Sequence, residues 1–133
     1  MSATVNTTLT ITSSNLTSDV ISLTLPTTLL SAVQGGMTRV KLATAAIAGA
    51  TVLATAEQYA AGSKLWVYNP STTTDGTERI HISLDEATSF CTLKGGDWAV
   101  IPWTGTANAG DLDIEAYGQT AAGQVLEYGV FGV

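Results

Sequence analysis

The sequence predicts an all-β protein, an antiparallel β-sandwich with little helix. Apolar and polar residues alternate with a period of two through many short segments. Turn-forming residues separate these segments at intervals of about 8–12 residues, which is the spacing typical of sandwiches and barrels. No segment supports a helix longer than two turns. The length of 133 residues suits one domain, residues 1–133.

The first strands are expected in residues 4–12 and 20–25. In "TVNTTLTIT" (4–12) apolar and threonine side chains alternate, and "VISLTL" (20–25) alternates in the same way until Pro26. Residues 15–19 between them have turn-like composition. For the Thr- and Asn-rich residues 1–18, two alternatives stay open: the first strand of the sandwich, or an arm that reaches a neighbouring molecule.

The next segments are weaker. Residues 27–36, "TTLLSAVQGG", fit either one helical turn or a loop that ends at Gly35 and Gly36. Strands are expected within 38–44 and 51–56, where aliphatic residues alternate with polar ones or stand close together.

The second half contains the clearest strand signals, each bounded by turn residues. These strands are expected in residues 64–69, 79–84, 90–93, 97–103, 111–117 and 125–131. The strand number and length favour a jelly roll, which has about eight strands in two sheets. An immunoglobulin-like sandwich is the alternative, but it usually has about 100 residues and often paired cysteines, whereas Cys91 is the only cysteine here.

The charge content excludes some partners and favours others. The net charge is −6 and the five cationic residues are scattered, so neither nucleic acid nor an anionic membrane is expected to bind. Charged residues make up only 12%, against about 25% in an average soluble domain. This favours a protein that hides much of its surface in an assembly. A tightly folded monomer coated in Thr and Ser is the alternative.

The sequence gives no targeting signal. The N-terminus lacks the basic and apolar regions of a signal peptide, and the apolar run at 43–56 is too short to span a bilayer. We therefore expect synthesis in the cytoplasm without secretion.

Candidate catalytic and metal-binding groups do not form a recognisable set. His81 is the only histidine, so a catalytic triad or a histidine-based metal site lacks partners. Phosphate-binding loops, nucleophile elbows and zinc-protease motifs are absent from the sequence. We expect His81 to lie on the solvent side of a strand, and we expect no enzyme activity, cofactor or metal.

Acidic residues cluster in one predicted strand. Asp111, Asp113 and Glu115 alternate along 111–117 and would share one face. Calcium needs six to eight oxygen ligands, usually from a loop, so we expect a solvated strand face that discourages edge-to-edge aggregation. Asp85, Glu86 and Asp97 lie in no catalytic motif.

Two predicted strands, in 64–69 and 97–103, are apolar on both faces. Trp66 and Tyr68 lie opposite two aliphatic residues, and a similar pattern continues in the second strand. In an isolated sandwich the outer face should be polar. Three interpretations stay open: a purely structural core, an oligomer or capsid contact, and a platform that stacks on sugars.

Tryptophan and tyrosine are enriched in protein interfaces. On this basis the candidate interface residues are Trp66, Tyr68, Ile101, Trp103, Thr104 and Tyr128.

The second half also resembles a known group of proteins. "LWVYN", a Thr-rich loop, "RIHISL", "FCTLKGGDWAVIPW", "DLDIEAY" and "VLEYGVFG" follow one another between residues 64 and 133. This series resembles small virion structural proteins of tailed bacteriophages, the jelly-roll decoration (cement) or minor head proteins. Residues 1–63 resemble them only loosely, and the shared motifs are structural rather than catalytic.

The resemblance implies a non-enzymatic virion protein, made in the host cytoplasm and located on the capsid exterior. It would bind the major capsid protein, commonly as a homotrimer, and bridge capsid subunits. Gly95 and Gly96 would form a turn, Trp98 would pack in the sandwich core, and Trp103 with the 104–110 loop would contact another subunit. The alternative is a host-attachment or glycan-binding module of a head or tail fibre.

Overall fold

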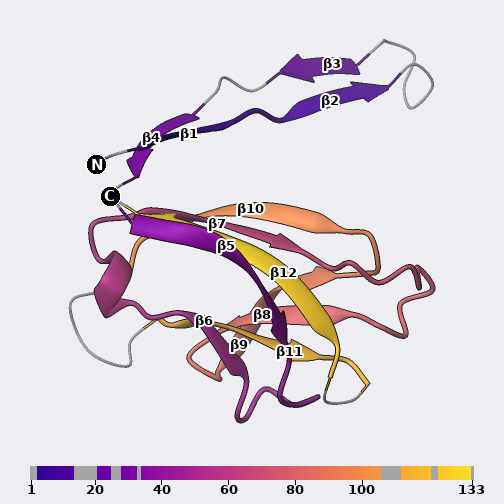
Figure 1. Cartoon of the computed structure of the whole chain (residues 1–133). Coiled ribbons are helices and arrows are strands. Elements are labelled where there is room, and N and C mark those ends of the chain that lie inside the picture. Colours follow the sequence, from indigo (N-terminus) through magenta and orange to yellow (C-terminus); the bar gives the residue numbers. More distant parts are fainter. Residues whose placement is uncertain are drawn as a thin grey trace.

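The computed structural model describes residues 3–13, 21–24, 28–32, 34–105, 112–120 and 123–132. The fold is all-β, as predicted, and two four-stranded antiparallel sheets face each other (Figure 1). The strand order of the first sheet is β10 (Trp98–Trp103), β7 (Ser63–Tyr68), β12 (Val125–Gly132) and β5 (Gln34–Lys41). That of the second is β6 (Thr51–Ala54), β11 (Ile114–Gly118), β8 (Ile80–Leu84) and β9 (Thr88–Leu93).

The strand pairs of the sandwich are nested. β8 pairs with β9, β7 with β10, β6 with β11, and β5 with β12. Each pair encloses the previous one in the sequence, as if one long hairpin had been wound into two sheets. This arrangement of eight strands is consistent with a jelly roll.

The core lies between the two sheets and follows the period of two. On β7, Leu65 and Val67 are fully buried and meet Ile80 and Ile82 of β8 in one cluster. Full burial of such a side chain stabilises the fold by about 1.5–3 kcal/mol. Further buried members are Leu42, Leu53, Leu93, Ile114, Leu126 and Val130.

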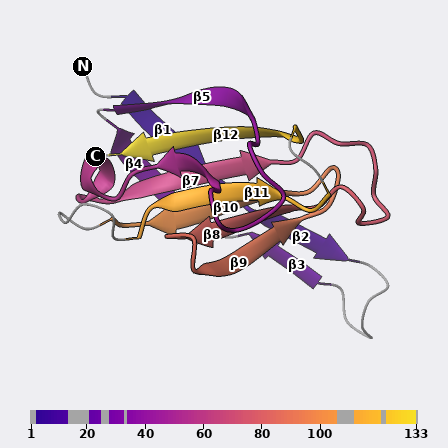
Figure 2. The same ribbon diagram turned by 90° about the horizontal axis from the view of Figure 1, so that it is seen from below.

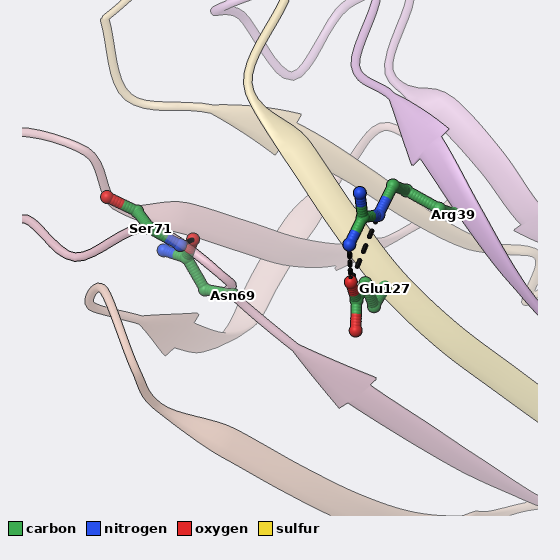
Figure 3. Close-up of polar contacts among 4 residues, drawn as sticks. All are labelled: Arg39, Asn69, Ser71 and Glu127. Carbon is green, nitrogen blue, oxygen red and sulfur yellow. Dashed lines mark hydrogen bonds and ion pairs between the residues drawn. The ribbon is translucent and has the colours of Figure 1, made fainter.

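Asn69 fixes the end of β7, where the sequence predicts a strand end (Figure 3). Its side chain is buried, and Nδ2 donates hydrogen bonds to the carbonyl oxygens of Glu78 (2.8 Å) and Leu93 (3.2 Å). Its own carbonyl accepts a bond from the Gly96 amide at 2.9 Å. Gly96 has φ +83°, so the predicted Gly-Gly turn uses a conformation that suits glycine.

The expectation for residues 27–36 is wrong. The segment forms neither a helical turn nor a loop, because β4 (Thr28–Ala32) pairs with β1 (Ala3–Thr7) and β5 begins at Gln34. This pairing with a distant segment outweighs the weak local helical pattern. The helix in the described part of the chain is a three-residue 3₁₀ turn, Glu57–Tyr59.

The N-terminal strands form an arm outside the two sheets. The predicted strand 4–12 is divided into β1 and β2 (Thr10–Ser13), and β2 pairs with β3 (Ile21–Thr24). Within the described residues, β1 to β4 pair only with one another. Figures 1 and 2 show this arm crossing the outer side of the first sheet. The described strands of residues 1–18 belong to neither four-stranded sheet, and an arm that reaches a neighbouring molecule stays a prediction. The predicted turn at 15–19 lies outside the described residues.

Candidate functional site

The outer face of the first sheet gathers aromatic side chains from three strands. In the β10–β7 register, Trp98 lies opposite Tyr68 and Val100 opposite Trp66. On β12, Gly129 lies opposite Trp66. We call this surface the aromatic face; its residues are Met37, Trp66, Tyr68, Trp98, Val100 and Phe131.

The aromatic face combines stacked rings with exposed side chains. The rings of Trp66 and Tyr68 are stacked side by side, with centroids 6.3 Å apart and planes 20° apart. Trp98 is 55% exposed and Met37 68% exposed. A Cβ atom at Gly129 would lie only 3.0 Å from Met37 Cγ, so glycine allows the Met37 side chain to lie close to β12.

A groove of about 700 Å³ lies between this face and the arm. The aromatic face forms its floor, and Asn6 and Thr8 of the arm line it from the other side. Lys64 and Glu127 add charged groups to a lining that is otherwise mostly apolar on the floor and polar on the side of the arm. The volume falls in the range of about 300–1,000 Å³ that is usual for ligand sites.

Glu127 is engaged by a neighbouring cation. Arg39 Nε donates a hydrogen bond to Glu127 Oε1 at 3.0 Å, and the guanidinium forms an ion pair with the same carboxylate (Figure 3). The Arg39 side chain is 67% exposed, so this pair stabilises the fold by no more than about 1 kcal/mol. Its main consequence is that the charge of Glu127 is compensated at the edge of the groove.

The structure separates the predicted interface residues into two groups. Trp66 and Tyr68 lie on the aromatic face, and Thr104 is exposed just after β10. Ile101, Trp103 and Tyr128 point to the inner side and pack against the core cluster. All three are only partly buried, and their role as contacts to another subunit stays a prediction.

The prediction that Trp98 packs in the sandwich core is wrong. Trp98 lies on the outer side, whereas Trp103 is half-buried with its ring centroid 5.9 Å from that of Tyr59. The period of two correctly places the two tryptophans on opposite faces. It cannot show which face is inside, because both are apolar; the pairing of Ile101 with the buried Leu65 decides this.

Sequence reasoning missed Met37, Lys64, Phe131 and Asn6 as members of the site. Phe131 and Lys64 are paired in the β12–β7 register, and Met37 lies opposite Gly129 on β5. These neighbours come from strands far apart in the sequence. The available signal was the alternation of "YGVFG", which places Phe131 and Gly129 on the face opposite Val130.

His81 has a structural environment on the second sheet. Its Nδ1 is 3.0 Å from Thr92 Oγ1, and its Nε2 is 2.9 Å from Gln119 Oε1. The ring stacks on Tyr117 with centroids 4.9 Å apart. Both ring nitrogens are therefore occupied, on the outer side of β8 as predicted.

The expectation of a solvated acidic strand face is wrong for Glu115, which is only 6% exposed. Its Oε2 accepts a hydrogen bond from the Glu86 amide at 2.6 Å. Burial raises the pKa of Glu115; this hydrogen bond opposes the effect, and the nearby charges of Glu86, Asp85 and Asp113 add to it. Asp111 lies outside the described residues.

The other carboxylates near Glu115 bind loop amides. Asp85 accepts hydrogen bonds from the amides of Leu112 and Asp113, the latter at 2.7 Å. Asp85 and Glu86 both have positive φ, as the central residues of a type I′ hairpin turn require. Such a turn usually contains glycine or asparagine, so these bonds hold a backbone conformation that is otherwise costly.

Two further bonds complete this cluster: the Ala56 amide donates to Asp113 Oδ1 and the Gly49 amide to Glu86 Oε1, each at 2.7 Å. Within the described ranges, no group of three or more His, Cys, Asp or Glu residues could hold a metal ion. The acidic cluster thus connects loops.

Comparison with known protein families, with curated protein sequences and with solved structures gave no match for this chain. In the described part of the chain, no helix has the length and apolar character needed to cross a membrane.

Proposed function

We propose that this chain is a non-enzymatic virion structural protein of a tailed phage. In this proposal it binds the major capsid protein on the outside of the head and stabilises the capsid by bridging its subunits, acting as a homotrimer. The observation that carries the proposal is the side of the molecule that holds both the arm and the aromatic face. The face exposes Trp98 and Met37, the arm exposes Ile11 and Leu23, and within the described residues the arm strands pair with no strand of the sandwich.

The topology supports the same proposal. The nested pairs of β5 to β12 are consistent with a jelly roll, and the phage proteins that the second half resembles are expected to have this fold. Fold alone does not determine function, so this observation adds weight only together with the surface.

The surface suits a protein with several partners. Trp98 and Met37 on the face, and Ile11 and Leu23 on the arm, are exposed large apolar residues on one side of the molecule. Exposed apolar patches mark interaction sites in soluble proteins, and Trp98 and Met37 line one groove. A trimer on a capsid presents each contact three times, so individually weak contacts combine into tight binding.

The test is binding to capsids that lack the protein. Purified protein is titrated onto bare heads and the bound copies are counted after sedimentation, with unassembled capsid protein as the control. We expect saturation at a copy number set by the capsid symmetry and a higher temperature of head disruption. Binding that does not saturate, or equal binding to unassembled subunits, would contradict a bridging role.

A glycan-binding module of a head or tail fibre is the second candidate. It is favoured by the stacked Trp66 and Tyr68 rings, which have the polar groups of Lys64, Glu127 and Asn6 beside them in the groove. Aromatic rings flanked by hydrogen-bonding groups suit a sugar. Glycan-array binding that Trp66→Ala abolishes, with no binding to heads, would favour this candidate over the first.

A further inference from the structure

We infer that the groove over the aromatic face holds the arm tip of a second copy of this chain. The arm tip is the ladder of β2 and β3, Thr10–Ser13 with Ile21–Thr24. The inference specifies the self-association contained in the proposed function, and it does not depend on a capsid.

The arm tip requires support that its own chain does not give. It is a two-stranded ladder, and an isolated ladder of this kind is at best marginally stable in water. Ile11 and Leu23 lie directly opposite each other and are 46% and 45% exposed. An aliphatic cross-strand pair stabilises a ladder fully only when its apolar surface is removed from water.

The arm also lacks the usual protection against pairing with another chain. Asp19 is the one charged residue among residues 1–33 of the sequence. Natural edge strands that must stay free commonly carry lysine or other charges, or proline. β2 and β3 carry neither charges nor proline, which indicates that another protein surface covers this ladder.

The groove is bordered by its own arm but not filled by it. Asn6 and Thr8, near the base of the arm, line the groove, whereas Ile11 and Leu23 of the arm tip remain exposed. The two views agree that the arm passes over the first sheet as a separate layer (Figures 1 and 2). One chain therefore presents an uncovered apolar tip and an unfilled apolar groove at the same time.

A second copy is the occupant that matches the groove in both chemistry and number. The charges at the groove are Lys64 and Glu127, and Glu127 is already paired with Arg39, so a neutral aliphatic ladder enters without leaving an acidic group unpaired. Each chain carries one tip and one groove. A tip-to-groove contact is heterologous, and it produces a finite ring when the rotation between copies closes.

The first experiment measures the mass of the free protein by light scattering over a range of concentrations. We expect a fixed multiple of the 13.7 kDa chain mass. The double variant Ile11→Thr/Leu23→Thr, which keeps β-branched or β-compatible side chains on the tip, should be monomeric, and so should Trp98→Ala in the groove. The matched controls are Thr12→Ala/Ser22→Ala, on the opposite face of the same ladder, and Phe90→Ala, an exposed aromatic residue outside the groove.

A wild-type protein that is monomeric at all concentrations would overturn the inference. An oligomer that survives in both the tip and the groove variants would overturn it as well. Circular dichroism of each variant verifies that the sandwich is folded, and a variant that is not folded is replaced by Leu23→Ser or Trp98→Thr.

The second experiment uses cysteine pairs in a Cys91→Ser background. Leu23→Cys and Trp98→Cys variants are mixed and oxidised, and we expect disulfide-linked pairs that neither variant alone forms in comparable yield. A mixture that cross-links no better than the separate variants contradicts tip-to-groove contact. If one chain carrying both substitutions closes an intrachain bond and stays monomeric, the arm folds onto its own groove and the inference fails.

These outcomes are separable from those of the proposed function. Heads that bind a monomeric wild-type protein would keep the proposed function and remove the inference. A wild-type oligomer that becomes monomeric in the tip and groove variants, but binds no head, would keep the inference and remove the proposed function.

Discussion

The outer faces of the two sheets differ in how they are completed. On the second sheet, His81, Tyr117 and Thr92 bind or stack on neighbours from their own chain, and buried Glu115 lies beneath a loop amide. On the first sheet, Trp98 and Met37 are open to solvent. The second sheet also exposes Val52 and Phe90, so the two faces differ in how many side chains are bonded within the chain. Removing the apolar surface of the aromatic face from water would be favourable. The outer side of the second sheet, which we call the bonded side, is thus held mainly by contacts within the chain, whereas the aromatic face is largely open to solvent.

The largest effect on the free energy of unfolding is expected on the bonded side, at Asp85. Asp85→Ala removes the acceptor for the amides of Leu112 and Asp113 and leaves the positive-φ turn without its support. We expect a loss of about 2–3 kcal/mol in the free energy of unfolding, measured by urea titration. Asp85→Asn retains one carbonyl acceptor and should lose less. Equal stability of wild type and Asp85→Ala would show that the carboxylate cluster does not hold these loops.

A smaller effect is expected at Tyr117 on the same side. Its hydroxyl is 2.6 Å from Ser89 Oγ, and its ring stacks on His81. Tyr117→Phe keeps the stacking and removes one hydrogen bond, which should lower the free energy of unfolding by about 1 kcal/mol. Ser89→Ala should give a similar loss, and the double variant should not add the two. Full additivity in this cycle would contradict a direct bond.

Glu115 should give a change of opposite sign. Because the pKa of Glu115 is raised in the folded protein, the folded state holds the proton more tightly than the unfolded state does. Its contribution to stability is therefore best at low pH and is lost as pH rises from the ordinary glutamate pKa through the folded value.

Glu115→Gln removes this penalty and keeps an oxygen that can accept the bond from the Glu86 amide. We expect a modest gain in the melting temperature at pH 7 and a smaller difference between the two proteins near pH 4. The comparison is a melting series from pH 4 to 8 with Glu57→Gln, an exposed site, as control. A loss of stability at pH 7 would indicate that the charge itself is needed there.

The sequence allowed the strands to be located but not the sides of the sheets. Alternation was sufficient for β7, β8 and β12, whose predicted and observed ranges agree closely. For β10 both faces are apolar, so the inward side depended on pairing with β7, which local pattern does not contain. The residue pattern of one strand does not show which of its faces is buried when both are apolar, because the neighbouring strand determines this.

The predictions for residues 27–36 and for Glu115 were wrong for the same reason. β4 is a strand because β1, more than twenty residues earlier, pairs with it. Glu115 is buried because the turn at Glu86 places an amide against it. Composition nevertheless held a usable signal for the arm: residues 1–33 carry a single charge, which is unusual for a free ladder at a protein surface.

The smallest effect on intrinsic stability is expected at Trp98, and it distinguishes the two sides most directly. Because Trp98 is largely exposed, Trp98→Ala should change the free energy of unfolding by no more than about 0.5 kcal/mol at high dilution, where copies are apart. At higher concentration, the association through the aromatic face that we infer would stabilise the folded chain by mass action. The melting temperature of the wild type should therefore rise with protein concentration, while that of Trp98→Ala stays constant.

The control is Phe90→Ala, on the second sheet, which should retain the concentration dependence of the wild type. A melting temperature of the wild type that does not respond to concentration would mean that the aromatic face is as self-sufficient as the other.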